Sequence, residues 1–318
     1  MPLRRIALSE FRTIGRGIAR PEDVVALRDG RVYASHHAGG VAQIGPEDGL
    51  RVIGAPAGAP NGINMDAQGR IIIANFGVTD GVSGPLERLD LTTGAREILV
   101  DRIAGRVLTA CNYPVIDRTG TIWCSHSTSA KTWPEALDRR ADGFIFVYRP
   151  DGSSEIVAEG LRFANGMALS ADEQFLYCTQ SSNADVLRYP ILPGAKLGKP
   201  ERYGPRLGLV FGVKVNPGLK LPSFITRHLG YTDGLGFDAE QNLWVTLPAA
   251  HKIVAITPAR DIVVIAHDPT GKLIQSPTNI SWGGADLRTL YVGDLAADYV
   301  LTAPSPVAGQ PMLHHGLH

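Results

Sequence analysis

Six copies of one short pattern recur along the 318-residue chain and restrict its fold more than any other feature. In each copy, a polar residue is followed by small or apolar residues, a turn, and a strand segment with a bulky side chain. The copies begin at Glu22, Asn61, Asn112, Asn165, Asp233 and Asn279. Their leading residues are 39, 51, 53, 68 and 46 positions apart. A period of about 40–50 residues is typical of β-propellers, so six copies predict six blades around a central channel.

The segments between the repeats favour an all-β protein. Short runs rich in Val, Ile, Leu, Tyr and Trp alternate with turns formed by many of the 36 glycines and 22 prolines, and helical periodicity is scarce. We expect four antiparallel strands per blade and one propeller domain over residues 1–318. Since open sheet edges invite aggregation, a strand around residues 4–9 or 11–15 is predicted to complete the last blade beside residues 290–303. Residues 304–318 are predicted to form a flexible tail.

Charge and cysteine content exclude several classes of partner. The chain has 31 Lys plus Arg and 31 Asp plus Glu, so a zero net charge gives no electrostatic basis for binding nucleic acid or an anionic membrane. Three cysteines without a Cys-x-x-Cys spacing predict neither a disulfide framework nor a zinc ribbon. We find no signal-peptide pattern and no apolar run of about 18 residues. The expectation is a soluble, cytoplasmic protein that acts on a small molecule.

The polar residues that lead the repeats predict a metal site. The innermost strand of each propeller blade runs along the channel, so these residues should meet at one channel mouth. Carboxylates from Glu22 and Asp233, with amide oxygens from Asn112 and Asn165, form a hard ligand set that suits Ca²⁺ better than Zn²⁺. The alternative is that pairs such as Asn61-Gly62 only form turns, and for this pair taken alone we favour the turn. Acidic residues in two copies at one rim favour a site.

Three segments carry a resemblance to a known family. Residues 163–179, which contain Asn165-Gly166, are one of them. Residues 233–245, with Asp233-Gly234 at one end and Trp244-Val245 at the other, and residues 278–292 are the others. They resemble repeats of the regucalcin/gluconolactonase family of six-bladed propellers, which includes luciferin-regenerating proteins. The resemblance extends over roughly residues 20 to 300.

This resemblance implies one divalent metal held by a Glu, an Asn and an Asp, which fall on Glu22, Asn165 and Asp233. Ca²⁺ is the expected ion, with Zn²⁺ or Mn²⁺ as alternatives. It implies that Asn112 lies near the metal or substrate and that Asp233 helps to activate water. The function expected from it is a carboxylic-ester hydrolase that opens a lactone or related ester. The alternatives are a phosphotriester or fluorophosphate hydrolase on the same metal, or a non-catalytic Ca²⁺-binding propeller.

Several further residues are candidates for binding the substrate. They are Asn61, Asn112, Tyr113, His36, His37 and His126, although a histidine is more often a structural hydrogen-bonding group. Related sugar lactonases often carry Arg and Asp around the position of Asn112, where this chain has Thr109, Ala110 and Tyr113. The loss of these charges predicts a preference for alkyl or aryl lactones and esters. Insertions at 125–142 and 203–231 are predicted to shape the pocket, the second as an apolar lid or as a surface loop.

Overall fold

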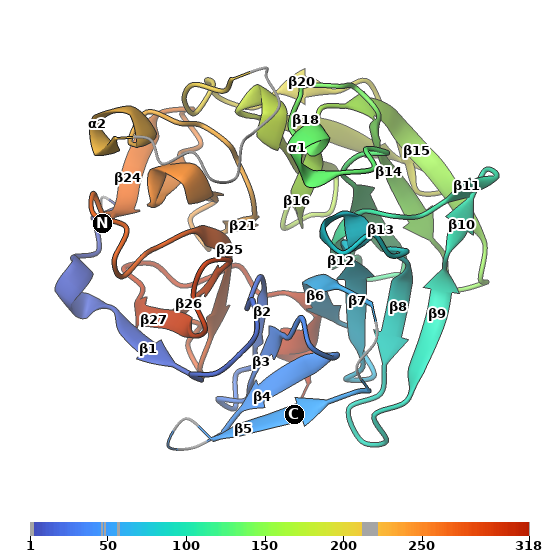
Figure 1. Ribbon diagram of the computed structural model, residues 1–318, viewed down its shortest axis with the longest axis horizontal. Helices are drawn as coiled ribbons and strands as arrows, with labels where there is room; N and C mark the ends of the chain where they lie inside the picture. Colours follow the sequence, from blue (N-terminus) through green and yellow to red (C-terminus); the bar gives the residue numbers. More distant parts are fainter. Residues whose placement is uncertain (1–2, 46, 48, 56–57, 212–221, 318) are drawn as a thin grey trace.

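The computed structural model describes residues 3–317 except 46, 48, 56–57 and 212–221. The described residues form six antiparallel blades around a central channel (Figure 1), as the repeats predict. From the channel outwards, blade one is β2 (Val24–Ala26), β3 (Val32–Ser35), β4 (Val41–Ile44) and β5 (Leu50–Ile53). Blade two is β6 (Pro60–Met65), β7 (Ile71–Asn75), β8 (Leu86–Leu89) and β9 (Arg96–Val100). Blade three is β12 (Cys111–Ile116), β13 (Ile122–His126), β14 (Gly143–Tyr148) and β15 (Ser154–Leu161).

Blades four to six complete the ring. Blade four is β16 (Ala164–Leu169), β17 (Phe175–Gln180) and β18 (Asp185–Leu192), and β18 pairs with both β19 (Lys196–Leu197) and β20 (Glu201–Arg202). Blade five is β21 (Leu235–Phe237), β22 (Leu243–Leu247), β23 (Lys252–Ile256) and β24 (Ile262–His267). Blade six is β25 (Pro277–Gly283), β26 (Thr289–Asp294), β27 (Val300–Pro304) and β1 (Arg12–Ile14). A small hairpin, β10 (Arg102–Ile103) and β11 (Arg106–Val107), lies outside these sheets.

The N-terminal strand closes the ring, as predicted for residues 11–15. β1 pairs antiparallel with β27, with Arg12 opposite Thr302 and Ile14 opposite Val300. The alternative segment 4–9 lies against blade five, where the Ile6 backbone N donates to Ile265 O at 2.7 Å. Both segments bury apolar side chains, because Ile6 is 1% exposed and Phe11 is 7% exposed.

Deletion of residues 1–16 is expected to lower the free energy of unfolding by several kcal/mol. Burial of one large apolar side chain contributes about 1.5–3 kcal/mol, and the deletion also exposes the edge of β27. Urea denaturation measures the change, with Arg5→Ala as a control that keeps β1. An unchanged unfolding midpoint in the deletion variant would show that the ring is closed by other contacts.

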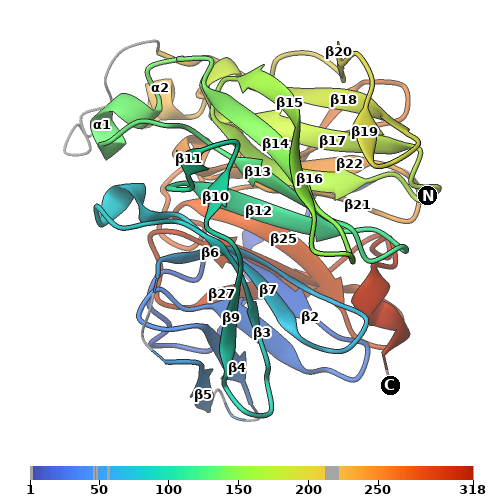
Figure 2. The same ribbon diagram turned by 90° about the vertical axis from the view of Figure 1, so that its right-hand side faces the viewer.

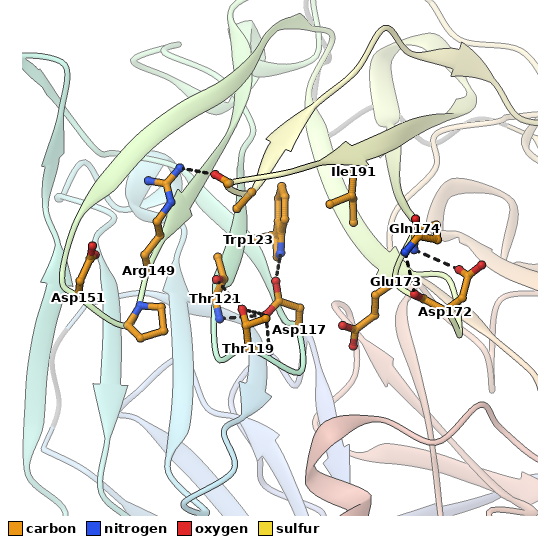
Figure 3. Close-up of a pocket in the computed structure, with 13 residues that line it drawn as sticks. Asp117, Thr119, Thr121, Trp123, Arg149, Asp151, Asp172, Glu173, Gln174 and Ile191 are labelled. Carbon is orange, nitrogen blue, oxygen red and sulfur yellow. Dashed lines mark hydrogen bonds between the residues drawn. The ribbon is translucent and has the colours of Figure 1, made fainter.

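A recurring aspartate turn explains the spacing of the repeats at the end of the channel where β12 and β21 finish. Asp117 accepts hydrogen bonds from the backbone N of Thr119 and Thr121 and, at 3.0 Å, from Trp123 Nε1 (Figure 3). In blade five, Asp238 likewise accepts from Trp244 Nε1 at 2.9 Å. The aspartate fixes the turn and seats the buried indole six residues later, so the same sequence pattern gives the same hairpin in both blades.

The C-terminal residues do not form the predicted free tail. After β27 the chain crosses the channel at the end opposite to α1 (Trp133–Ala136) and α2 (Ser223–Thr226), and Figure 2 shows these helices and the C-terminus at opposite ends. His314 and His315 are buried, and His315 Nε2 lies 3.0 Å from Ala26 O. The polar, histidine-rich composition suggested a tail, but both histidines are buried and His315 binds the backbone of β2 and β25 at this end of the channel.

The insertions predicted to shape the pocket lie at the end of the channel opposite to the C-terminus. Residues 125–142 contain α1 and residues 203–231 contain α2, while positions 212–221 of the predicted lid lie outside the described residues.

None of the helices in the described parts of the chain is long and apolar enough to cross a membrane. The cysteines Cys111, Cys124 and Cys178 are free and buried, in agreement with the absence of a disulfide framework.

Candidate metal centre

Glycines in the repeats allow the inner strands to approach one another closely. A Cβ on Gly166 would lie 2.6 Å from the Gly234 Cα, and a Cβ on Gly62 would lie 2.7 Å from Tyr113 Cδ2. Real Cβ atoms do not tolerate such distances, so only glycine fits there. The turn interpretation of Asn61-Gly62 is therefore wrong, because both residues lie inside strand β6.

Hydroxyl groups tie the leading residues of neighbouring blades together. Ser125 Oγ in β13 donates to Asn165 O at 2.7 Å, and Thr179 Oγ1 in β17 donates to Asp233 O at 2.6 Å. Thr278 Oγ1 in β25 donates to Glu22 O at 2.7 Å. These bonds each link one blade to the next in sequence around the ring. They fix the backbones of Glu22, Asn165 and Asp233 at one mouth of the channel.

The side chains of these residues converge. The Asn165 side chain lies close enough to the Asp233 carboxylate to oppose the rise of its pKa, and Glu22 lies close enough to reinforce that rise by charge repulsion. Asn165 Nδ2 also donates to Ser181 Oγ at 3.0 Å, which orients its amide. The Asn61 side chain also lies near the Glu22 carboxylate and contributes to lowering its pKa. The structure thus brings Glu22, Asn61, Asn165 and Asp233 together, as the repeat register predicts.

The carboxylates of Glu22 and Asp233 bring two acidic groups together in a buried environment. Burial, and then repulsion by Glu22, raises the pKa of Asp233 well above its ordinary value. Burial also raises the pKa of Glu22, while the Arg20 guanidinium opposes that rise. Glu22 Oε2 is buried without a hydrogen-bond partner among the described residues, and Arg20 Nη2 lies 3.5 Å from it. Two buried carboxylates that face one guanidinium are unfavourable in their ionised form unless a further cation neutralises them.

The donor set fits a hard divalent cation. It contains two carboxylates and amide oxygens, which are the ligands that Ca²⁺ accepts and which leave positions for water. Among the described residues, no group of three or more His, Cys, Asp or Glu side chains could hold a metal. The converging set differs from such a group because two of its four members are asparagines.

Asn112 and Tyr113 occupy different places along the channel. Asn112 is buried beside Asn61, whose Nδ2 donates to Asn112 O at 3.2 Å. The Tyr113 side chain instead reaches Asn279 and Asp23, and it lines a cavity of about 460 Å³ towards the C-terminal end of the channel. The structure therefore places Asn112 next to Asn61, whereas Tyr113 faces the cavity at the C-terminal end of the channel.

The three candidate histidines have separate roles. His36 Nδ1 accepts a hydrogen bond from Ala19 N at 3.0 Å. His126 Nε2 accepts from the backbone N of Thr109 and Ala110, both at 3.2 Å, so it holds the chain before Asn112. His37 lies at the mouth, where its Nε2 is 3.1 Å from Asp80 Oδ2. One ring nitrogen of His36 and one of His126 thus accept backbone hydrogen bonds, and the expectation that these histidines bind the substrate stays a prediction.

One residue beside the site was missed by the sequence analysis. Arg20 Nη2 lies 3.5 Å from Glu22 Oε2, and Arg20 Nη1 lies 3.5 Å from His37 Nδ1. Its position two residues before Glu22 was the available signal. An arginine outside the repeated pattern is normally a surface group, and only the backbone path turns this one towards the channel.

Comparison with known proteins identifies the family. Residues 75–294 match the model of the SMP-30/gluconolactonase/LRE-like region, which is more than half of the chain. The chain belongs to the SMP-30/gluconolactonase/LRE-like family. Residues 6–44 also match the N-terminal model of strictosidine synthase-like proteins. The expected membership of the regucalcin/gluconolactonase family is thereby confirmed.

Individual relatives are distant. The adipocyte plasma membrane-associated protein Hemomucin of Drosophila melanogaster is 29% identical over 57% of this chain and 34% of its own length. A gluconolactonase of Zymomonas mobilis is 27% identical over 39% of this chain and 34% of its own length. The chain thus spans about a third of each of these curated relatives.

Solved structures share the fold. A Xanthomonas campestris gluconolactonase has a TM-score of 0.67 at 19% identity and covers 92% of this chain and 89% of its own. The calcium-binding protein regucalcin of Agrobacterium tumefaciens has a TM-score of 0.63 at 15% identity, covering 93% and 91%. At these identities the likeness shows the propeller architecture alone.

This member of the SMP-30/gluconolactonase/LRE-like family has an apolar cluster beside the channel mouth. Phe76 follows β7, Phe163 precedes β16 and Trp133 begins α1. Their ring centroids lie 6.0 Å (Phe76–Trp133), 5.9 Å (Phe76–Phe163) and 6.1 Å (Trp133–Phe163) apart. Phe76 and Phe163 are buried, so the insertion 125–142 packs Trp133 onto a small apolar core next to blades two, three and four.

His126 predicts a measurable acid sensitivity. Burial, with a smaller effect of Arg106, lowers the pKa of His126 to about 3. Because the folded state binds this proton more weakly than the unfolded state, its stability contribution is full above about pH 6.5 and is lost as the pH falls towards 3. His126→Gln keeps an acceptor at this position. We expect the variant to lose about 1 kcal/mol less stability per pH unit below 6.5 than the wild type in urea denaturation. Equal pH slopes would contradict this assignment.

A second pocket lies elsewhere and contains none of the predicted site residues. It is a cavity of about 570 Å³ between the turns of blades three and four (Figure 3). Its lining includes Asp117, Arg149 and Glu173. Asp117 is fully engaged in the turn that seats Trp123, so we assign this pocket no part in the metal centre.

Proposed function

We propose that this protein is a metal-dependent hydrolase that opens a lactone or a related ester, with Glu22, Asn165 and Asp233 holding one divalent cation, Ca²⁺. The observation that carries the proposal is the pair of buried carboxylates at the channel mouth, where Glu22 Oε2 has no hydrogen bond and Arg20 is the one cationic group within 4 Å of it among the described residues. Family membership and a relative named as a gluconolactonase support lactone opening. The named activity of that relative enters here as an analogy.

The residues of the chain divide the work. When bound, a divalent cation supplies positive charge that polarises a carbonyl group and makes bound water more acidic. Asp233 accepts the proton of the attacking water while the water oxygen bonds to the carbonyl carbon. It returns that proton to the ring oxygen as the ester bond breaks. The Asn112 amide holds the substrate, and Arg20 lies at the rim of the site.

A substrate panel tests the proposal. Lactones, aryl esters and phosphotriesters are each incubated with metal-stripped protein and with Ca²⁺, Zn²⁺ or Mn²⁺ added back. We expect lactone turnover that requires a metal. Faster hydrolysis of phosphotriesters would favour that alternative chemistry on the same centre. Metal binding without turnover of any class would favour a non-catalytic calcium-binding propeller.

We expect kcat/KM to be at least tenfold higher for alkyl or aryl lactones than for gluconolactone. Thr109 and Ala110 stand where related sugar lactonases carry a charged group, and each sugar hydroxyl buried without a hydrogen bond costs about 1–3 kcal/mol. Apolar chains instead gain about 25 cal/mol per Å² of buried surface. The comparison uses the panel above under one set of conditions. A sugar lactone that is hydrolysed faster than every apolar one would show that other residues supply the polar contacts.

A further inference from the structure

Arg20 has a backbone conformation that its side chain disfavours. Its φ is +51°, in the left-handed region, which glycine adopts without steric cost and a residue with a Cβ adopts with strain. Its carbonyl accepts a hydrogen bond from Glu22 N at 2.8 Å, so this tight turn leads directly into the metal centre. Strained residues of this kind concentrate at functional sites. Eleven other non-glycine residues of the described chain share a positive φ, so the case for a role of Arg20 depends on the contacts of its side chain.

The Arg20 guanidinium lies at the channel mouth, and its two contacts there are long. It lies 3.5 Å from Glu22 Oε2 and 3.5 Å from His37 Nδ1, and the side chain is 20% exposed. Asp80 fixes His37 from the other side through Nε2 at 3.1 Å. An arginine carries five N–H donors, and these two long contacts leave several of them available.

The charges around Arg20 change when the site holds a cation. Two nearby acids are already satisfied, because Asp23 accepts from Val24 N and Ile63 N, and Asp294 accepts from Gln275 N and Ser276 N. A divalent cation would neutralise the remaining pair, Glu22 and Asp233. Arg20 would then lose its anionic partner and keep a positive charge at the rim of the pocket.

We propose that Arg20 is a specificity-determining residue that binds a carboxylate at the channel mouth. This inference rests on the proposed lactone hydrolysis. The carboxylate has two sources: an acidic group that the lactone already carries, or the group that ring opening creates. In that reaction a C–O bond forms to water, the ring C–O bond breaks, and the new acid loses its proton near neutral pH. The paired N–H groups of a guanidinium match a carboxylate in either case.

Arg20 reaches the site from blade one, because it directly precedes β2, which is the inner strand of that blade (Figure 1). A substrate over the carboxylates would thus meet a cationic group on the side of blade one. This arrangement assigns the site a lactone that carries an acidic group, or a neutral lactone whose acid product is held at Arg20.

The test compares two lactones that differ in one group. γ-Valerolactone carries a methyl group where 5-oxotetrahydrofuran-2-carboxylate carries a carboxylate, and their products are 4-hydroxypentanoate and 2-hydroxyglutarate. Arg20→Gln removes the charge, Arg20→Gly also removes the backbone strain, and Arg20→Lys keeps a charge without the planar fork. Arg28→Gln is the control, because Arg28 lies beyond the opposite end of β2, where it donates to Ala285 O. Calorimetry measures Ca²⁺ affinity in each variant.

If the substrate supplies the carboxylate, Arg20→Gln and Arg20→Gly should raise KM for the acidic lactone at least tenfold, with kcat and the KM for γ-valerolactone within threefold. If the product supplies it, both KM values stay constant and the inhibition constant of 4-hydroxypentanoate rises at least tenfold. Arg20→Lys should restore part of either effect. The proposal is overturned if KM and inhibition constants stay within twofold, if Arg28→Gln gives the same shifts, or if both KM values rise equally with a changed Ca²⁺ affinity.

Failure of the proposed function is a separate result. If the wild type opens no lactone, calorimetric titration of the Ca²⁺-loaded protein with 4-hydroxypentanoate and 2-hydroxyglutarate still tests Arg20. Binding of either acid that weakens at least tenfold in Arg20→Gln supports the carboxylate site. Equal binding in wild type and variant, or no binding to the wild type, overturns it.

Discussion

Asp233→Asn is expected to lower kcat/KM for lactone hydrolysis by about 10³-fold or more. Asparagine keeps the shape of the side chain and the contact with Asn165, but it cannot accept a proton from water. General-base catalysis by a positioned carboxylate contributes about 10²–10⁴-fold, and the lost negative charge also weakens cation binding. Initial rates at saturating Ca²⁺ measure the effect, so that the chemical contribution is separated from lower metal occupancy.

Asp151→Asn is the matched control for this variant. Asp151 is exposed in a turn at the other end of the molecule, where it accepts a hydrogen bond from Ser153 N. Its activity should equal that of the wild type. Retention of more than a tenth of the wild-type kcat/KM in Asp233→Asn would remove Asp233 from the mechanism. Full loss of turnover with Ca²⁺ still bound would separate its role in catalysis from its role as a ligand.

Glu22→Gln is expected to weaken Ca²⁺ binding at least 100-fold, which corresponds to about 2.7 kcal/mol. The change removes one of two carboxylate charges and leaves an amide of the same size. In the metal-free protein at pH 8 the same change should raise the free energy of unfolding, because burial disfavours the ionised carboxylate. Calorimetric titration with Ca²⁺ and urea denaturation provide the two readouts.

Glu10→Gln serves as the comparison. Glu10 forms an ion pair with Arg4 on the surface, so this change should leave Ca²⁺ affinity untouched and should not stabilise the metal-free protein. Equal Ca²⁺ affinities of Glu22→Gln and wild type would place the cation elsewhere or deny it altogether. The opposite signs of the two effects on Glu22 distinguish a ligand from an ordinary buried residue.

The sequence was sufficient to predict the ring and the register of its inner strands. The repeated Asp-turn spacing, as at Asp117 and Trp123, is local, so its geometry follows from the sequence itself. Closure by residues 11–15 followed from the need to cover the edge of the last blade. The convergence of Glu22, Asn165 and Asp233 followed because equivalent positions in a propeller face a common axis.

Features set by contacts between distant segments were not accessible in this way. Asn61-Gly62 has the composition of a turn, and only the close passage of β12 requires the glycine within a strand. The sequence around His126 does not show that its Nε2 accepts hydrogen bonds from the backbone N of Thr109 and Ala110. The histidines near the C-terminus suggested a tail because nothing local shows that the channel end receives them. Arg20 depends on one left-handed residue, which its neighbours in sequence do not reveal.

The most direct measurement is a titration of the metal-stripped protein with Ca²⁺ while lactone opening is followed by the release of acid. The account predicts no turnover without metal and activity that rises linearly and saturates at one equivalent per chain, with no such rise in Glu22→Gln at the same concentrations. Wild-type activity that is already full in the metal-stripped protein, or that saturates equally in Glu22→Gln, would contradict a catalytic cation held at Glu22, Asn165 and Asp233.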